Sequence, residues 1–300
     1  MTSLPRWADT NSTRNIDRRA GALRLIALAP IALSVALLTL ILAGCATQPN
    51  PNLYLAEARG YADELGNREA AQQALGTSAI MDYSGGGEHF RARENLLIQR
   101  PANIRVEVMS AAGVVLVVAT DGGQTAVFDP AKGLLMRGPA TAATLERYAR
   151  IPLPPQAAVR LLLGLVPDGS ALASPPASMT LPGPHSDNQT ILVYREPDGV
   201  TDEIGIGADR KLASVTEKLA DGRVSYRVAY GDWREAGKGI ETPCSIKAEF
   251  PRTGAKVAFT YENPTADPRI PGGAFVLAPS GVTKTMSLGM AGTRPEAPRG

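Results

Sequence analysis

The residue types that carry out metal and acid–base chemistry are few in this chain and lie far apart. Neither His89 nor His185 has a Cys, an Asp or a second His at the spacing of metal ligands. Glu107 and Asp129 could form a catalytic pair of carboxylates, but strands and turns carry such residues routinely. The sequence therefore predicts no metal site and no cofactor, and we expect the protein not to be an enzyme.

Two glycine-rich stretches lack the residues that a nucleotide site needs. Residues 84–87, Ser-Gly-Gly-Gly, are not followed by Lys and Ser or Thr, so we interpret them as a flexible turn and not as a phosphate loop. The stretch EIGIGADR, with Gly205 and Gly207, lacks the third glycine and the helix of a dinucleotide-binding motif. Its glycines indicate a strand or a bulge. The chain also lacks a Gly-x-Ser-x-Gly nucleophile elbow.

Cys45 is the residue whose surroundings do predict a covalent reaction. Arginines precede an apolar run over residues 25–42, and the run ends abruptly in Leu-Ala-Gly-Cys. This ending resembles the bacterial lipobox, in which the cysteine is diacylated, becomes the new N-terminus and is acylated again. An uncleaved anchor is the alternative, but spanning helices more often end in aromatic or cationic residues, and residues 46–49 contain none. The sequence predicts a lipoprotein signal peptide over residues 1–44.

A lipidated Cys45 would tether the protein to a membrane through residues 45–52, which we interpret as a linker. Each buried methylene contributes about 0.8 kcal/mol, so several acyl chains together hold a protein on a bilayer. Ala46 is not the aspartate that resembles an inner-membrane retention signal. We therefore expect the periplasmic face of the outer membrane of a Gram-negative envelope.

Cleavage before Cys45 would leave 256 of the 300 residues, enough for one domain with a sizeable core. The removed segment carries a net charge of +3, so the remainder has a formal net charge of −1 instead of +2. This balance indicates neither a nucleic-acid surface nor a basic membrane patch. Cys244 has no second free cysteine to pair with, and we interpret it as a small buried apolar residue, with a reactive thiol as the alternative.

Period-two patterns dominate the chain after one predicted helix that starts near Tyr54. In residues 104–108, isoleucine and valine point one way while Arg and Glu point the other, as in a strand with one buried face. The Asp-Gly pairs at residues 121–122 and 221–222 separate β-rich runs and predict tight hairpin turns. The sequence predicts a mainly β fold built of antiparallel hairpins.

A helical segment interrupts the hairpins. Thr141 is a candidate N-cap for a first helix, and residues 151–155, Ile-Pro-Leu-Pro-Pro, end it and start a second helix through Gly164. Because such short helices must pack on something, we expect them to cover the concave face or mouth of a curved sheet. The Pro-rich residues 168–184 predict a long loop, and residues 283–300 predict a disordered tail.

Residues 91–270 resemble the family of the outer-membrane lipoprotein receptor LolB and, more distantly, that of its periplasmic carrier LolA. The resemblance lies in the order of a strand, the turn SAAG, the strand VVLVVA, the turn DGG and the strand QTAVFDP. It continues through RGPATAATLERYARIPLPPQAAVRLLLGLVP and, later, through VSYRVAYGDW and KVAFTYEN. The C-terminal stretch AFVLAPSGV exceeds the family's minimal pattern.

The resemblance implies a LolA/LolB-like lipid-binding domain over residues 53–282. Its fold would be an incomplete antiparallel β-barrel, a strongly curved sheet with a helical lid around an apolar cavity. Its function would be that of a lipid-anchored outer-membrane receptor that accepts acyl chains of lipoproteins and helps to place them in the membrane. The implied partners are acylated lipoproteins, a periplasmic LolA-like carrier and outer-membrane lipid, with no nucleic acid. A palmitoyl-sized chain costs on the order of 10 kcal/mol in water, so a carrier must shield it.

The candidate cavity residues are apolar positions on the predicted strands and helices. They are Ile104, Val106, Val108, Leu116, Val118, Leu145, Leu162, Leu163 and Val228. In the family, the turn that corresponds to residues 110–113 tends to carry a bulky apolar residue for membrane contact. Here that position is Ala112, so Val114, Val115 or the lipid anchor would have to serve. The alternative function is that of a structural or assembly lipoprotein, in which the same scaffold has a filled interior and binds a protein partner.

Overall fold

The computed structural model describes residues 51–288. Cys45, the predicted signal peptide over residues 1–44 and residues 289–300 lie outside the described residues. The described chain is mainly β and forms a strongly curved antiparallel sheet that does not close, with three α-helices and two short 3₁₀ helices. The predicted fold class is therefore confirmed. Among these residues, none of the helices has the length and apolar character needed to span a membrane.

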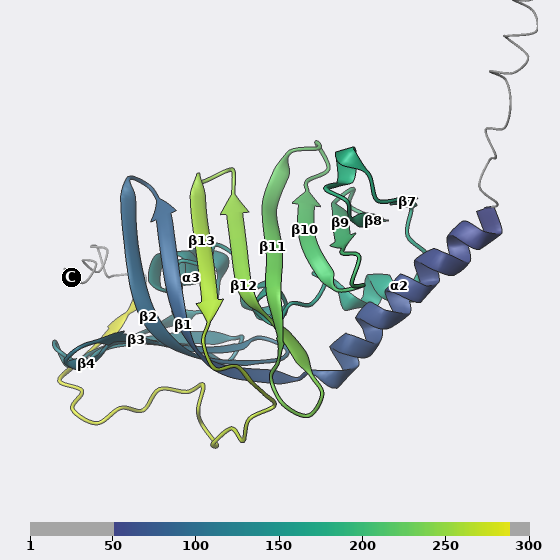
Figure 1. Cartoon of the computed structure of the whole chain (residues 1–300). Coiled ribbons are helices and arrows are strands. Elements are labelled where there is room, and N and C mark those ends of the chain that lie inside the picture. Colours follow the sequence, from purple (N-terminus) through teal and green to yellow (C-terminus); the bar gives the residue numbers. More distant parts are fainter. Residues whose placement is uncertain (1–50, 289–300) are drawn as a thin grey trace, which may run out of the picture. The chain divides into compact units, whose positions relative to one another are not determined.

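The sheet runs in the order β15-β6-β5-β4-β3-β2-β1-β13-β12-β11-β10-β9-β8-β7, and β14 pairs with β1. Its strands are β1 (Ala74–Gly85), β2 (Glu88–Gln99), β3 (Asn103–Ser110), β4 (Gly113–Thr120), β5 (Gln124–Asp129), β6 (Leu134–Pro139), β7 (Ser178–Thr180), β8 (Thr190–Arg195), β9 (Thr201–Ile206), β10 (Leu212–Lys218), β11 (Val224–Glu235), β12 (Glu241–Phe250), β13 (Ala255–Tyr261), β14 (Thr265–Ala266) and β15 (Lys284–Ser287). Figure 1 shows the bend of the sheet, with β3 and β4 running beneath β1, β2 and β13.

Most of these strands are joined as hairpins, as the glycine-containing turns predict. Residues 86–87 form the turn between β1 and β2, so the glycine run at this position is a turn. The turn at residues 121–123 joins β4 to β5, and the carboxylate of Asp121 accepts hydrogen bonds from the N–H groups of Gly123 and Gln124. Gly122 and Gly222 both have positive φ angles, which glycine adopts without strain. Gly205 lies in β9, next to an irregularity in its pairing with β10, which confirms the interpretation as a strand or bulge glycine.

Two helices, α3 (Ala142–Ala149) and α4 (Pro155–Leu162), lie between β6 and β7 in the chain and pack on the main core. The Thr141 hydroxyl accepts a hydrogen bond from the Thr144 N–H, which confirms the predicted N-cap. Helix α4 starts with Pro155 in its first turn, where a missing N–H costs nothing. In Figure 1, α3 lies behind the sheet.

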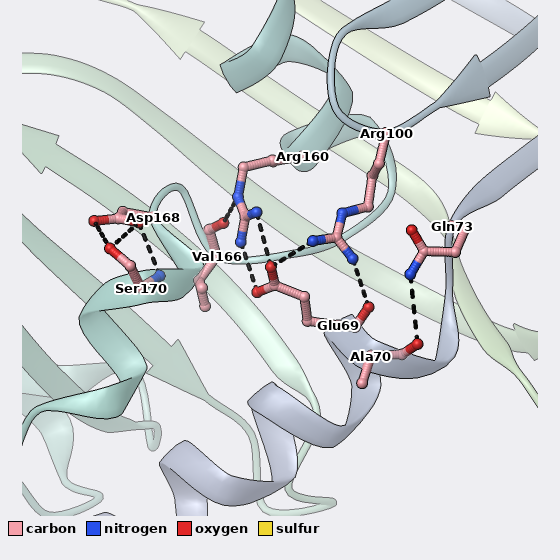
Figure 2. A network of polar contacts seen from close by, with 8 residues as sticks. All are labelled: Glu69, Ala70, Gln73, Arg100, Arg160, Val166, Asp168 and Ser170. Atoms are coloured by element: carbon pink, nitrogen blue, oxygen red, sulfur yellow. Dashed lines mark hydrogen bonds and ion pairs between the residues drawn. The ribbon is translucent and has the colours of Figure 1, made fainter.

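Helix α2 (Pro51–Ala71) is tied to α4 and to the turn that follows β2 by one carboxylate. Glu69 accepts hydrogen bonds from both terminal nitrogens of Arg160 at 2.9 and 2.7 Å, and one from Arg100 at 2.8 Å. The Arg160 Nε also donates to the Val166 carbonyl oxygen at 2.7 Å, and Figure 2 shows both guanidinium groups converging on Glu69. Because these side chains are mostly buried, the network holds three segments in one arrangement.

Three predicted boundaries differ from the structure. Helix α2 begins at Pro51, so the last two residues of the predicted linker belong to the helix. The predicted loop over residues 168–184 contains the 3₁₀ helix η1 (Gly169–Ala173) and strand β7, and η2 (Pro184–Ser186) begins at its end. The predicted disordered tail starts too early, because Lys284–Ser287 forms β15 and pairs in parallel with β6.

The C-terminal segment before β15 covers the outer face of the sheet. Leu277 packs with Val117, Ala119, Phe128 and Leu135 in a small apolar cluster separate from the main core. The carbonyl oxygens of the segment also accept hydrogen bonds from arginines of β3 and β6, at 3.0 and 2.7 Å. This C-terminal segment therefore shields a second apolar face, which accounts for the apolar residues Val117 and Ala119 on the outward face of β4.

Candidate functional site: an apolar cavity between the sheet and helix α3

A cavity of about 250 Å³ lies between α3 and strands β1 to β5. Most of its wall is apolar. The lining residues are Met81, Phe90, Ala92, Glu94, Val108, Val115, Leu116, Asp129, Ala131, Lys132, Arg147, Tyr148, Ala149 and Arg150. Its volume lies near the lower end of small-molecule sites, which span about 300–1,000 Å³. The cavity is therefore large enough for part of an acyl chain or for a small apolar group.

The strand register creates the apolar wall. In β2, the residues at every second position from Phe90 to Ile98 turn inward, while Arg91 and Arg93 turn to solvent. Val108 of β3 lies opposite Glu94, and Leu116 of β4 lies opposite Val108. Small and medium side chains on neighbouring strands leave space that larger ones would fill.

Helix α3 forms the other wall through its C-terminal turn. Tyr148 is buried, and its hydroxyl contacts the sulfur of Met136 at 3.9 Å. Arg150 follows the helix with a left-handed backbone, φ 61°. Its guanidinium lies 5.1 Å from the ring centre of Tyr83 and 5.3 Å from that of Phe90. Helix α3 and its C-cap therefore contribute one aromatic ring and two cations, Arg147 and Arg150, and Arg150 lies over two further rings of the sheet.

Charged groups at the cavity are paired with partners of opposite charge. Arg150 forms an ion pair with Glu88 at 3.2 Å, and Lys132 forms one with Asp129 at 2.9 Å. Arg147 lies over the ring of Tyr148, with its guanidinium carbon 5.4 Å from the ring centre. These charges flank an apolar interior, an arrangement that suits a ligand with an apolar body and a polar end.

Glu94 is the exception inside the cavity. Its side chain is only 3% exposed, and it makes no hydrogen bond or ion pair with any residue between 51 and 288. Burial raises the pKa of Glu94 to about 8. At neutral pH this carboxyl group is therefore mostly protonated, which reduces the cost of keeping it in an apolar wall.

The structure separates the nine candidate cavity residues into three groups. Val108 and Leu116 line the cavity at α3. Leu162 and Val228 line a second space of only about 20 Å³ between α4 and strands β11 to β13. The others are buried in the continuous core and line neither space: Ile104, Val106, Val118, Leu145 and Leu163. The role of all nine in holding an acyl chain stays a prediction.

The turn at residues 110–113 is largely exposed, including both of its alanines. Val114, the residue after this turn, is 36% exposed near the start of β4. Val115, the next residue, lines the cavity. The turn therefore carries a small apolar tip directly beside the cavity, and its contact with a membrane stays a prediction.

The candidate groups for catalysis and metal binding do not come together. Glu107 pairs with Arg105, whereas Asp129 pairs with Lys132, so each carboxylate has a cation of its own. Within residues 51–288, no three His, Cys, Asp or Glu side chains form a group that could hold a metal ion. Cys244 is fully buried, as predicted, and burial raises the pKa of its thiol.

Sequence reasoning missed Glu94, Phe90, Tyr148 and Arg150, which all line the cavity. The signal for Glu94 is present in β2, because the alternation that places Phe90 and Leu96 inward also places this carboxylate inward. A charged residue in the apolar register of a strand marks either an edge or an interior polar site. Arg150 gives no such signal, because its inward direction depends on the left-handed backbone after α3.

Neither a protein-family model nor a curated protein sequence matches this chain. Among solved structures, a DUF1329 family protein from Desulfovibrio piger is similar, with 14% identity and a TM-score of 0.49, over 74% of this chain and 97% of that one. A LolA superfamily protein from Nitrosomonas europaea is similar with 12% identity and a TM-score of 0.49, over 73% of this chain and 97% of that one. The neighbours in structure thus include LolA superfamily proteins at low sequence identity.

Proposed function

We propose that this protein binds acyl chains in the cavity between α3 and the sheet, and that it does so without catalysis. As a lipid-anchored receptor at the periplasmic face of the outer membrane, it would accept acylated lipoproteins from a periplasmic LolA-like carrier and pass them to the bilayer. The observation that carries the proposal is the apolar cavity itself, which is lined by Val108, Leu116 and two aromatic rings.

The physical need for such a cavity follows from the cost of acyl chains in water. Each methylene that leaves water gains about 0.8 kcal/mol, so even a partly enclosed chain is held with substantial free energy. The cavity of about 250 Å³ encloses part of a chain and leaves its remainder to the cavity mouth or to a partner. Partial enclosure suits a protein that must release its cargo, because complete burial would slow the release.

The predicted acylation of Cys45 supports the proposed location. A lipid anchor would keep the domain within linker distance of the bilayer, so that a bound chain has a short path into the membrane. The exposed Val114, beside the cavity-lining Val115, offers a contact point for that transfer.

A second candidate function is that of a scaffold that binds a protein partner. The observation in its favour is the solid packing of Ile104, Val106, Val118, Leu145 and Leu163, which were candidates for a cavity and are core residues instead. In this case, the space at α3 would be an incidental packing defect and would take up no lipid.

The test is acceptance of an acylated lipoprotein from a periplasmic carrier by the full chain, together with native mass spectrometry for bound lipid. We expect one-way transfer and a bound acyl species. The variant Leu116→Trp fills the cavity and should reduce uptake at least about tenfold, because the chain would lose its contact area.

The matched control is Leu55→Trp, which introduces the same side chain at an exposed position of α2, 45% exposed. It should leave uptake unchanged. The acyl-binding proposal would be refuted if native mass spectrometry shows the protein without bound lipid and if neither variant changes the uptake of the acylated lipoprotein. That result would favour the scaffold function.

A further inference from the structure

The buried carboxyl group of Glu94 lies in the wall of a mostly apolar cavity and has no partner within residues 51–288. Its cross-strand neighbours are Ala79 and Val108, which offer only aliphatic carbon. The side chain is 3% exposed and makes no hydrogen bond or ion pair within residues 51–288. Buried polar groups in folded proteins nearly always have a hydrogen-bond partner, so an exception in a cavity wall points to a ligand.

The cations that line the same cavity are engaged with other groups. Arg150 pairs with Glu88, Lys132 with Asp129, and Arg147 lies over the ring of Tyr148. From β13, the Tyr261 hydroxyl donates to the Leu162 carbonyl oxygen at 2.9 Å and is thereby also occupied. The described chain supplies no partner to Glu94, and its side chain lines the cavity, so a group inside the cavity can supply one.

The surroundings of Glu94 favour a neutral partner. Burial raises its pKa to about 8, so the carboxyl group both donates and accepts a hydrogen bond at neutral pH. A hydroxyl group also does both, and removing it from water costs less than removing a charged group. A cationic amine would have to lose its water first, and that loss is far more expensive.

We propose that the cavity selects acyl chains that carry a hydroxyl group on the chain, and that this hydroxyl pairs with the carboxyl group of Glu94. The inference rests on the proposed acyl-binding function and names its ligand class. A plain chain would cover the carboxyl group and leave it without a partner. Sites built to hydrogen-bond a hydroxyl reject analogues that lack it, for this reason.

The test uses the full chain with dansylated undecanoate as a fluorescent probe of the cavity. The competitors are dodecanoate and three hydroxydodecanoates, with the hydroxyl at the β, middle or ω carbon. We expect at least one hydroxydodecanoate to displace the probe at about tenfold lower concentration than dodecanoate, which corresponds to about 1.4 kcal/mol.

Two substitutions of Glu94 distinguish the effect of its hydrogen bond on ligand preference from the effect of its side-chain shape. In Glu94→Leu, we expect probe binding to persist and the preference for the hydroxylated chain to disappear or reverse. In Glu94→Gln, the amide still donates and accepts, so the preference should persist in part. Circular dichroism of both variants checks that the fold is retained.

The outcomes distinguish this inference from the proposed function. If the wild-type protein binds neither probe nor fatty acid, the acyl-binding function fails and the inference fails with it. If all chains bind equally, before and after Glu94→Leu, the acyl-binding function stands and the hydroxyl preference is refuted. If dodecylamine displaces the probe at a lower concentration than any hydroxydodecanoate does, the hydroxyl preference is refuted and an amine is the preferred partner of Glu94.

Discussion

The two helices of the insertion cover the sheet with different results. At α4, the sheet and the helix pack so closely that only about 20 Å³ remains, whereas a cavity of about 250 Å³ remains at α3. Both regions carry the same alternation of apolar and polar residues along their strands. The alternation of apolar and polar residues therefore determines which face of a strand is buried. The volume of the side chains determines whether the space at that buried face is filled.

Specific contacts explain why α4 is packed tightly. Gly164, after α4, has a positive φ of 68°, and a Cβ atom there would lie 2.6 Å from the ring of Pro243. The Tyr261 hydroxyl donates to the Leu162 carbonyl oxygen at 2.9 Å. The corresponding contact of α3 is that of the Tyr148 hydroxyl with a methionine sulfur at 3.9 Å, a weak acceptor.

The largest effect on the filled region is expected from Glu69→Ala. It leaves Arg100 and Arg160 mostly buried without their shared carboxylate, so the free energy of unfolding should fall by roughly 3–5 kcal/mol. Urea denaturation measures this change in the free energy of unfolding. The control is Glu64→Ala, which breaks the exposed pair with Arg210 and should cost less than about 1 kcal/mol. Equal losses in the two variants would show that the Glu69 network does not hold α4 in place.

The cavity region is expected to respond to pH through Glu94. Its pKa in the folded state is about 8, above the value of about 4.3 in an unfolded chain, so the folded state binds the extra proton between these values. Stability should therefore fall as the pH rises from about 4.3 to about 8. In Glu94→Gln this part of the fall disappears, whereas the part from Asp202, whose pKa burial raises to about 7, remains. At pH 8 the variant should be more stable than the wild type by on the order of 4 kcal/mol.

Thermal and urea unfolding between pH 5 and pH 8.5 measures the pH effect. The control is Glu249→Gln on β12, because a hydrogen bond from Lys256 lowers the pKa of Glu249 instead of raising it. This variant should keep the wild-type slope over the same range. A wild-type protein whose stability does not fall toward pH 8 would contradict the buried state of Glu94.

A matched valine pair compares the two regions directly. Val228→Ala removes two methyl groups from a side chain that is 2% exposed, and it should cost about 2 kcal/mol. Val108→Ala makes the same change at the cavity, where part of the surface already lacks contacts, and it should cost less than about 1 kcal/mol. Urea denaturation of both variants measures the loss in the free energy of unfolding. A larger loss in Val108→Ala than in Val228→Ala would mean that the cavity is closed in solution.

The smallest effect is expected at the start of α3. Thr141→Ala removes the hydroxyl that accepts the Thr144 N–H and should cost about 1 kcal/mol. Thr141→Ser keeps the acceptor and should be nearly neutral. If acyl binding weakens in the alanine variant and not in the serine variant, the orientation of α3 controls the cavity. Equal stability of all three proteins would show that the cap does not stabilise α3.

Much of the fold could be predicted from the sequence because its signals are local. Asp-Gly pairs, alternating strands, the Thr141 cap and the proline-rich break before α4 each depend on a few neighbouring residues. The error at the C-terminal tail has a non-local cause. The tail after Thr283 has little hydrophobic pattern of its own, and it forms a strand because β6 offers a free edge.

The candidate site could be predicted only in part. Val108 and Leu116 were found because alternation assigns them to the inner face, and they line the cavity. The same rule assigned Ile104, Val106 and Val118 to that face, but these residues are packed against neighbours and line no space. Periodicity along a strand indicates the direction in which a side chain points. It contains no information on the residues of other elements that pack against that side chain.

The sequence by itself determined the antiparallel hairpins, the insertion of two helices and the buried face of each strand, because backbone geometry and side-chain period are properties of short segments. Only the tertiary structure decided that α4 fills its region while α3 leaves a cavity, and that Glu94 faces that cavity without a partner. The reason is that volume and hydrogen-bond satisfaction depend on residues brought together from distant parts of the chain.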